Sequence, residues 1–141
     1  MILMDKNYVG ILLERKGKLL FQLRDNNDKI SNPNTWGLFG GGIEKGETPK
    51  QAIIREIKEE LDITLDQKRI IPLLKTKKIS IFYYALENHQ NKFSLHEGQA
   101  YHFFKIHEII FKKNILFSLR LLLLVYPLLK IFKKSKRIKK S

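Results

Sequence analysis

The sequence contains no cysteine among its 141 residues. Disulfide bridges and metal sites built on thiolates are therefore excluded. This composition fits a reducing compartment, and we expect the protein to be cytoplasmic. Its four histidines show no zinc-binding spacing. The first six residues also lack the pattern of a secretory signal peptide.

Acidic residues are scarce relative to basic ones. The chain has 14 Asp and Glu against 27 Lys and Arg, which gives a formal net charge of +13. Such a surplus favours polyanionic partners, namely nucleotides, nucleic acid or an anionic membrane surface. A proteome rich in lysine is the alternative explanation for part of the surplus. The length fits one domain with a core of its own.

Several of the few acidic residues lie in one stretch that is predicted to be a helix. Thr48 is a suitable N-cap, Pro49 suits the first helical position, and Gln51 completes a capping box. An apolar stripe at helical spacing follows, formed by Ile53, Ile57 and Leu61.

Glu56, Glu59 and Glu60 fall on a different face of this helix, at positions i, i+3 and i+4. Their carboxylates converge near the negative end of the helix dipole, where like charges repel one another. Hard divalent cations prefer such oxygen ligands, whereas the alternative is an ordinary solvated face. The glycines at 40–42 favour the first interpretation, because a glycine-rich loop brings backbone groups close to a ligand.

The stretch from Gly41 to Ile63 resembles the Nudix box, G-x5-E-x7-R-E-U-x-E-E-x-G-U, in which U is aliphatic. The matching residues are Gly41, Glu47, Arg55, Glu56, Ile57, Glu59, Glu60 and Ile63. One position departs, because Asp62 stands where the family has a glycine that ends the helix in a left-handed conformation. Aspartate tolerates that conformation better than most residues. The box covers about a sixth of the chain.

The resemblance implies an α/β fold, a Nudix-type α/β/α sandwich around a mixed β-sheet. Alternating patterns agree with a layered α/β domain and predict strands at 8–13, 18–24, 69–75, 79–86 and 100–106. We expect residues 1–127 to form the Nudix hydrolase domain. A last helix ending near Pro127 would cover the second face of the sheet, and 128–141 would be a flexible basic tail.

The resemblance also implies an activity, the Mg²⁺-dependent hydrolysis of a nucleoside diphosphate linked to a further group X, with Mn²⁺ as a substitute cation. The MutT-like subset cleaves a nucleoside triphosphate to a monophosphate and pyrophosphate, and this is the expected reaction. ADP-ribose, a nucleotide sugar or a capped RNA end are alternative substrates. A nucleotide-binding domain without catalysis is the alternative of another class.

Site residues inside the box follow from the same resemblance. Gly41, Glu56, Glu59 and Glu60 would hold the metal, and Gly40 and Gly41 would approach the substrate through their backbones. Arg55 would pair with Glu47 and hold the loop against the helix.

Three further candidates lie outside the box. Arg24 stands where MutT-like members place an arginine on substrate phosphates, although it also reads as an exposed charge at a strand end. Trp36 either packs under the loop or stacks on a base. Glu97, in the segment 96–99, resembles a glutamate that binds metal or acts as the base, but it also reads as a turn residue. Glu56 and Glu97 both remain candidates for the base.

The C-terminal region, 115–132, is intensely apolar and six cations follow it, namely Lys133, Lys134, Lys136, Arg137, Lys139 and Lys140. One interpretation is a membrane-associated helix with a polybasic end. Interruptions at Arg120, Pro127 and Lys130 argue against a full span. We favour a packing helix and expect at most weak contact with anionic membranes. RNA is a further candidate partner, and the sequence does not define the oligomeric state.

Overall fold

A computed structural model of the protein describes residues 7–90 and 93–140. Residues 1–6, whose pattern argued against a signal peptide, lie outside this description. The strands are β1 Tyr8–Arg15, β2 Lys18–Leu23, β3 Trp36–Gly37, β4 Phe39–Gly42, β5 Ile71–Lys75, β6 Ile79–Ala85 and β7 Ala100–Phe104. The helices are α1 Pro49–Leu61, the 3-10 turn η2 Gln67–Arg69, α2 Ile106–Ile109 and α3 Phe117–Lys140.

Strand β1 is the centre of a mixed sheet whose main order is β3-β2-β1-β6-β5. Along one edge β1 pairs in parallel with β6 from Tyr8 to Glu14. Two strands share the other edge of β1. Strand β4 pairs with the first half of β1 and β2 pairs with its end, and both pairings are antiparallel. Both faces of β1 are covered, so Val9 and Ile11–Leu13 are completely buried. This explains why the strand reads as an unbroken apolar run.

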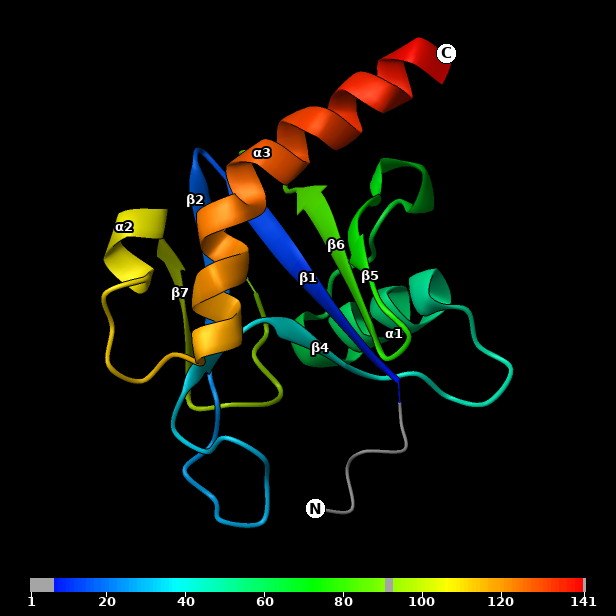
Figure 1. The fold of residues 1–141 in the computed structure, drawn as a ribbon. Coiled ribbons are helices and arrows are strands. Elements are labelled where there is room, and N and C mark those ends of the chain that lie inside the picture. The colour runs from blue at the N-terminus through cyan, green and yellow to red at the C-terminus, as the bar shows by residue number, and fades with distance from the viewer. Residues whose placement is uncertain (1–6, 91–92, 141) are drawn as a thin grey trace.

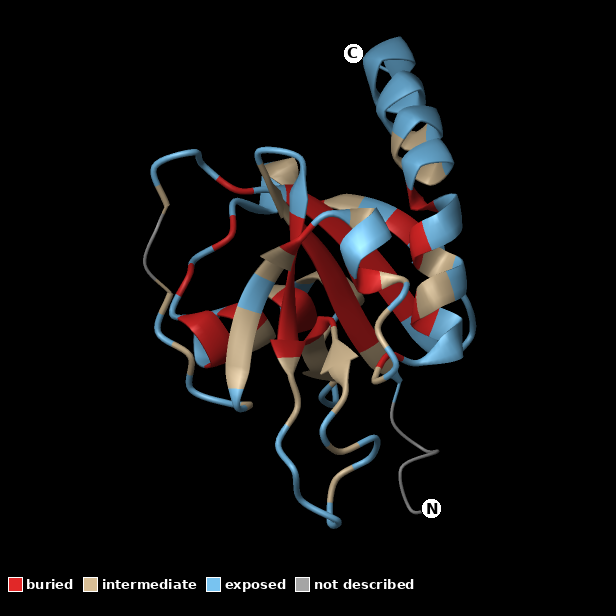
Figure 2. Cartoon of the chain, turned by 90° about the vertical axis from the view of Figure 1, so that its left-hand side faces the viewer, coloured by how far each residue is buried: buried red, intermediate tan, exposed pale blue. Residues whose placement is uncertain are grey.

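The two faces of the sheet are covered by different helices (Figure 1). Ile11 and Leu13 of β1 pack with Ile53 and Ile57 of α1 in one core cluster. Leu12 points the other way and packs in a second cluster with residues of α3. Figure 2 shows the buried residues concentrated in the strands and on the inward sides of the helices. The α/β/α sandwich around a mixed sheet is therefore confirmed.

Helix α1 begins and ends where the sequence predicts. The Gln51 N–H donates to the Thr48 hydroxyl over 3.2 Å, and the Thr48 N–H donates to the Gln51 side chain over 2.9 Å, which completes the capping box. At the other end Asp62 takes a left-handed conformation, with φ 57° and ψ 33°. The aspartate thus preserves the helix end that glycine provides in the family pattern.

The glycine-rich segment is a strand rather than the loop that we expected. Gly40, Gly41 and Gly42 belong to β4 and pair with Gly10, Val9 and Tyr8 of β1. A Cβ atom on Gly40 would lie 2.0 Å from the carbonyl oxygen of Val9. Only glycine permits this approach, so the segment can pair with the central strand while α1 packs across it.

The expected end of the last helix near Pro127 is wrong, because α3 continues through this proline to Lys140. Proline removes one backbone hydrogen bond and bends a helix, and the second half of α3 turns away from the sheet (Figure 1). Leu123 and Tyr126 pack on the sheet before the bend, and Lys130 pairs with Glu14 after it. The division of the chain at 127 stays a prediction. In the described part of the chain, no helix has the length and apolar character to cross a membrane.

Candidate active site

Helix α1 places its three predicted ligands in different environments. Glu60 is buried, with 3% of its surface exposed, whereas the Glu59 side chain is 58% exposed. Glu56 lies between these extremes, with a side chain that is 13% exposed. The backbone N–H of Gly40 donates a hydrogen bond to Glu60 Oε2 over 3.0 Å, so the end of α1 is attached directly to β4.

Gly41 and Glu56 are in close contact. A Cβ atom at position 41 would lie 2.5 Å from the Glu56 carboxylate, closer than real Cβ atoms approach. The lack of a side chain at 41 therefore makes the space in which the Glu56 carboxylate lies. This places the Gly41 backbone beside that carboxylate, as the proposed ligand set requires.

Arg55 connects the box loop to the helix, and its expected pairing with Glu47 is present. The guanidinium donates to both carboxylate oxygens of Glu47, over 2.8 and 3.0 Å, and to the carbonyl oxygen of Gly42 over 3.0 Å. It also donates to Glu56 over 2.7 Å and to Glu59 over 3.3 Å. The hydrogen bonds from Arg55 lower the pKa of Glu47. The planar guanidinium of Arg55 thus holds both the loop and the acidic face of the helix in place.

Glu97 belongs to the segment before β7 and lies near enough to Glu56 and Glu60 for its charge to repel theirs. That segment is held in place, because His96 N–H donates to the Glu60 carbonyl oxygen over 3.0 Å and Gln99 N–H donates to the Leu23 carbonyl oxygen over 2.8 Å. Burial, followed by repulsion from Glu97 and Glu56, raises the pKa of Glu60 to about 8. Burial also raises the pKa of Glu56, and the hydrogen bond from Arg55 offsets this only in part.

The acidic face suits a hard divalent cation, although it does not form a ready-made cage. Within residues 7–90 and 93–140, no three acidic or histidine side chains stand close enough together to hold a metal ion as they are. The donors are nonetheless carboxylate oxygens of the type that Mg²⁺ and Mn²⁺ prefer. Burial, followed by repulsion from neighbouring glutamates, raises the pKa values of Glu56 and Glu60, and a bound dication would lower them.

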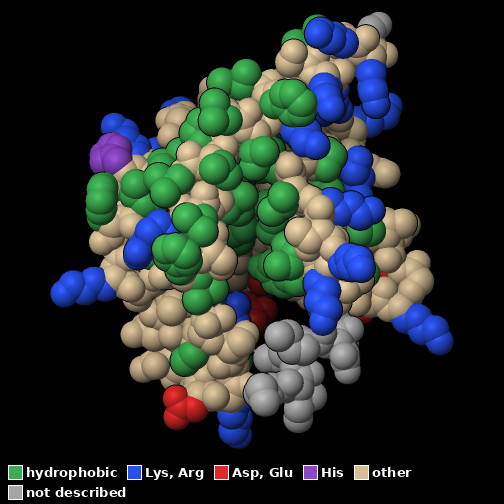
Figure 3. Space-filling model, in the orientation of Figure 1, with side chains coloured by type: hydrophobic (Ala, Val, Ile, Leu, Met, Phe, Trp, Pro, Cys, Tyr) green, Lys and Arg blue, Asp and Glu red, His purple; other side chains and the backbone are tan. Residues whose placement is uncertain are grey.

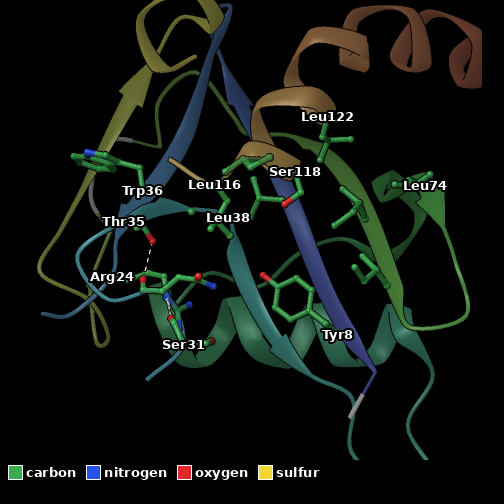
Figure 4. A pocket seen from close by; sticks show the side chains of 15 residues that line it. Tyr8, Arg24, Ser31, Thr35, Trp36, Leu38, Leu74, Leu116, Ser118 and Leu122 are labelled. Atoms are coloured by element: carbon green, nitrogen blue, oxygen red, sulfur yellow. Dashed lines mark hydrogen bonds between the residues drawn. The ribbon is translucent and has the colours of Figure 1, made fainter. Parts of the chain in front are cut away.

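A cavity of about 360 Å³ opens beside this face, between α3 and the sheet (Figure 4). Tyr8 and Arg24 line one side, and the Arg24 Nε donates to the Ser31 carbonyl oxygen over 3.0 Å. The opposite walls are mostly apolar and include Leu38 and Leu122. Burial and then repulsion from Glu60 raise the pKa of Tyr8. Tyr8 therefore lies between the cavity and the carboxylates.

Trp36 packs against β7 in the structure. Its ring packs edge-on against Phe104, with ring centroids 4.9 Å apart and an interplanar angle of 86°. Figure 4 shows the ring directed away from Tyr8 and Arg24. Trp36 lines the cavity as well as packing, and its stacking on a base stays a prediction.

Two site residues were missed by the sequence analysis, namely Gln22 and Tyr8. Gln22 is 3% exposed, donates to the Leu38 carbonyl oxygen over 3.2 Å and forms a side-chain hydrogen bond with Glu60. The sequence contained a signal for Gln22, because it is a polar residue on the same face of β2 as the buried Leu20. Tyr8 has no such signal, because a tyrosine at the start of a strand is ordinary.

A model of the NUDIX domain matches residues 4–122 of the chain. The protein belongs to the Nudix family. Among curated relatives, an uncharacterised Nudix hydrolase of Listeria innocua is 48% identical over 56 residues, 39% of this chain and 32% of that protein. An RNA pyrophosphohydrolase of Mannheimia succiniciproducens is 41% identical over 64 residues, 45% and 29% of the two chains. A dihydroneopterin triphosphate diphosphatase of Escherichia coli K12 is 35% identical over 71 residues, 49% and 43%.

These alignments span less than half of each relative, so they support the Nudix family without defining a substrate. Solved structures cover more of the chain. The Escherichia coli ORF135 protein superposes with a TM-score of 0.65 at 22% identity, over 87% of this chain and 89% of its own. A MutT Nudix hydrolase of Burkholderia pseudomallei gives 0.64 at 21% identity, over 84% and 95%. At such identities the likeness concerns the Nudix fold alone.

Proposed function

We propose that this Nudix protein hydrolyses a nucleoside triphosphate, or its deoxy form, to the monophosphate and pyrophosphate, in the manner of the MutT-like subset. One observation carries the proposal: Glu60 lies near enough to Glu56 and Glu97 for their charges to act on it, and Tyr8, on which Glu60 also acts, lines a largely apolar cavity together with Arg24. An apolar pocket suits a base, and an acidic face suits a cation that accompanies phosphates.

The chain's own residues have separate roles in this reaction. Gly41, Glu56, Glu59 and Glu60 would hold Mg²⁺ or Mn²⁺. When bound, the cation screens the phosphate charges and polarises the phosphoryl oxygen. The substrate phosphates lie near Arg24, whose charge orients them.

A base must accept the proton of the attacking water. Glu56 accepts a hydrogen bond from Arg55 that fixes its carboxylate beside Gly41, where it is placed to hold the cation. Glu97 is exposed and belongs to a different segment from the helix carboxylates, so we assign it the role of base. Replacing Glu97 by glutamine should lower turnover with little change in the cation concentration that the reaction requires, whereas Glu56→Gln should mainly weaken cation binding.

The decisive experiment follows pyrophosphate and orthophosphate release from a panel of nucleoside triphosphates, including oxidised ones, with and without Mg²⁺. Pyrophosphate release that requires the cation supports the proposal. Glu60→Gln should lower turnover by several orders of magnitude with the fold intact. Glu87→Gln, which changes a half-exposed glutamate paired with Arg69, is the matched control. Near-normal turnover by Glu60→Gln would show that the assignment is wrong.

A second candidate substrate is the 5′ end of RNA. The RNA pyrophosphohydrolase similarity and the net charge of +13 favour it. Adding a triphosphorylated RNA oligonucleotide, ADP-ribose and a nucleotide sugar to the panel ranks these substrates directly. Saturable binding without product release from any of them would assign the chain to the non-catalytic class.

A further inference from the structure

Helix α3 is apolar on two opposite faces. The inner face packs on the sheet through Leu119, Leu123 and Tyr126. The outward face carries apolar residues at alternating spacings of four and three, and we call this set the outer stripe. The outer stripe consists of Phe117, Leu121, Leu124, Leu128 and Ile131, which are 49–72% exposed. Figure 3 shows apolar side chains gathered on the face of the molecule that α3 covers.

Basic side chains flank the outer stripe in the second half of α3. At 100° per residue, Lys134 and Lys136 fall on its two sides, while Lys133, Arg137 and Lys140 lie behind it. No acidic residue occurs anywhere after Glu108 in the sequence. In Figure 3 the basic side chains gather along the projecting end of this helix, beside the apolar ones.

Beyond the bend at Pro127, one side of the helix still contacts the rest of the protein, through Leu129, Lys130 and Lys134. The other side does not, and Leu128, Ile131 and Phe132 are 72%, 67% and 55% exposed. An exposed apolar stripe of this length needs a partner. The surrounding cations indicate what kind of partner it is, because they require negative charge beside an apolar layer.

We propose that α3 is an interfacial anchor that binds the surface of an anionic phospholipid bilayer. The outer stripe lies at the boundary between headgroups and acyl chains, and the flanking cations contact the headgroup phosphates. Such binding is reversible, because it rests on a short stripe and a small number of cations.

Two other occupants fit these observations less well. If two copies paired through their outer stripes, the cations of both helices would come together with no acidic residue of α3 to offset them. An RNA strand would satisfy the cations, but it offers no layer for a row of exposed aliphatic side chains. The bilayer matches both features. Helix α1 lies across the sheet from α3, so the acidic face stays clear of the membrane (Figure 1).

The test is co-sedimentation of the full chain with vesicles of phosphatidylcholine alone and with phosphatidylserine added. We expect binding to the anionic vesicles that is lost at high salt, and little binding to neutral ones. Leu128→Ser with Ile131→Ser should reduce the partition coefficient on the order of tenfold or more. Lys134→Gln with Lys136→Gln should weaken it about fivefold for each removed cation.

A matched control is Lys45→Gln with Lys50→Gln, which removes the same charge outside α3 and should change binding by no more than about twofold. Circular dichroism checks that each variant keeps its helices. A tryptophan introduced by Phe132→Trp adds a direct reading, since its fluorescence should shift to the blue on anionic vesicles and be quenched by brominated lipid.

Three results would each overturn the proposal. The first is no binding to anionic vesicles at moderate salt. The second is unchanged binding by Leu128→Ser with Ile131→Ser. The third is a concentration-dependent dimer in sedimentation equilibrium that this variant dissociates, which would assign the outer stripe to a second copy of the chain.

Discussion

The ammonium group of Lys130 lies 2.6 Å from a carboxylate oxygen of Glu14, and this contact joins the second half of α3 to the central strand β1. The hydroxyl of Tyr126 donates to the same carboxylate. Burial alone would raise the pKa of Glu14, but the hydrogen bonds from Lys130 and Tyr126 outweigh it and the pKa is lowered. A residue that the sequence assigned to a basic tail therefore takes part in the packing of the sheet.

Lys130→Met should lower the free energy of unfolding by about 1 kcal/mol at pH 7, since both side chains are partly in solvent. Glu14 has a lowered pKa, so its contribution is present above its ordinary pKa and is lost as the pH falls through the folded-state value. The difference between variant and wild type should therefore shrink below about pH 4. Urea unfolding at several pH values measures it, and a constant difference down to pH 3 would contradict the assignment.

Gly41→Ala should lower turnover while leaving the stability of the fold nearly unchanged. The new Cβ would displace the Glu56 carboxylate, which lies 2.5 Å away, and turnover should fall by roughly one to two orders of magnitude. Stability should change little, because a side chain and not the backbone yields.

Gly40→Ala is the matched comparison for Gly41→Ala. Its Cβ would meet the Val9 carbonyl oxygen at 2.0 Å, and its φ of 147° disfavours any side chain. A loss of more than about 2 kcal/mol of folding free energy is expected from thermal and urea unfolding. If both variants lost equal stability, the contact between Gly41 and Glu56 would not have the specific role assigned to it.

Arg55→Lys should reduce turnover and Mg²⁺ affinity by about 10–100-fold, although it keeps the charge. A lysine ammonium cannot span Glu47, Glu56 and Gly42 in one plane, so the loop and the acidic face lose their common support. Steady-state kinetics over a range of Mg²⁺ concentrations measures both quantities. Glu47→Gln should have a similar effect. The double variant should lose less, in free energy, than the two single variants lose together.

Asp62→Gly should raise the melting temperature by about 2–4 °C. The residue has φ 57°, which glycine adopts without the crowding that a Cβ causes. The substitution also removes the ion pair with Lys58, whose groups are both more than half exposed. Lys58→Ala removes the ion pair alone, so it measures how much of the gain in stability from glycine is cancelled by the loss of that pair. A lower melting temperature for Asp62→Gly would mean that the ion pair outweighs the backbone strain.

The sequence was most informative where local chemistry determines the structure. Thr48 and Gln51 define the start of α1, Asp62 its end, and the spacing of the box residues places Arg55 against Glu47. These features depend on residues within one or two turns of each other, so a single chain displays them.

Other features depend on tertiary contacts and left little local signal. Gly40–42 form a strand because β1 is available to pair with them, and α3 passes Pro127 because the sheet and Glu14 hold both of its halves. Gln22 and Tyr8 join the site only when β2 and β1 lie beside α1. Their roles could not be read from neighbouring residues.

The arrangement around β1 has a consequence for folding during synthesis. The β1–β2 hairpin can close at once, but the parallel partner β6 begins at Ile79, about seventy residues later. Until that segment leaves the ribosome, one complete edge of the most apolar strand stays without its partner and is open to aggregation. Slow translation before residue 79 would lengthen this vulnerable interval, and chaperone binding to the nascent chain should be strongest within it.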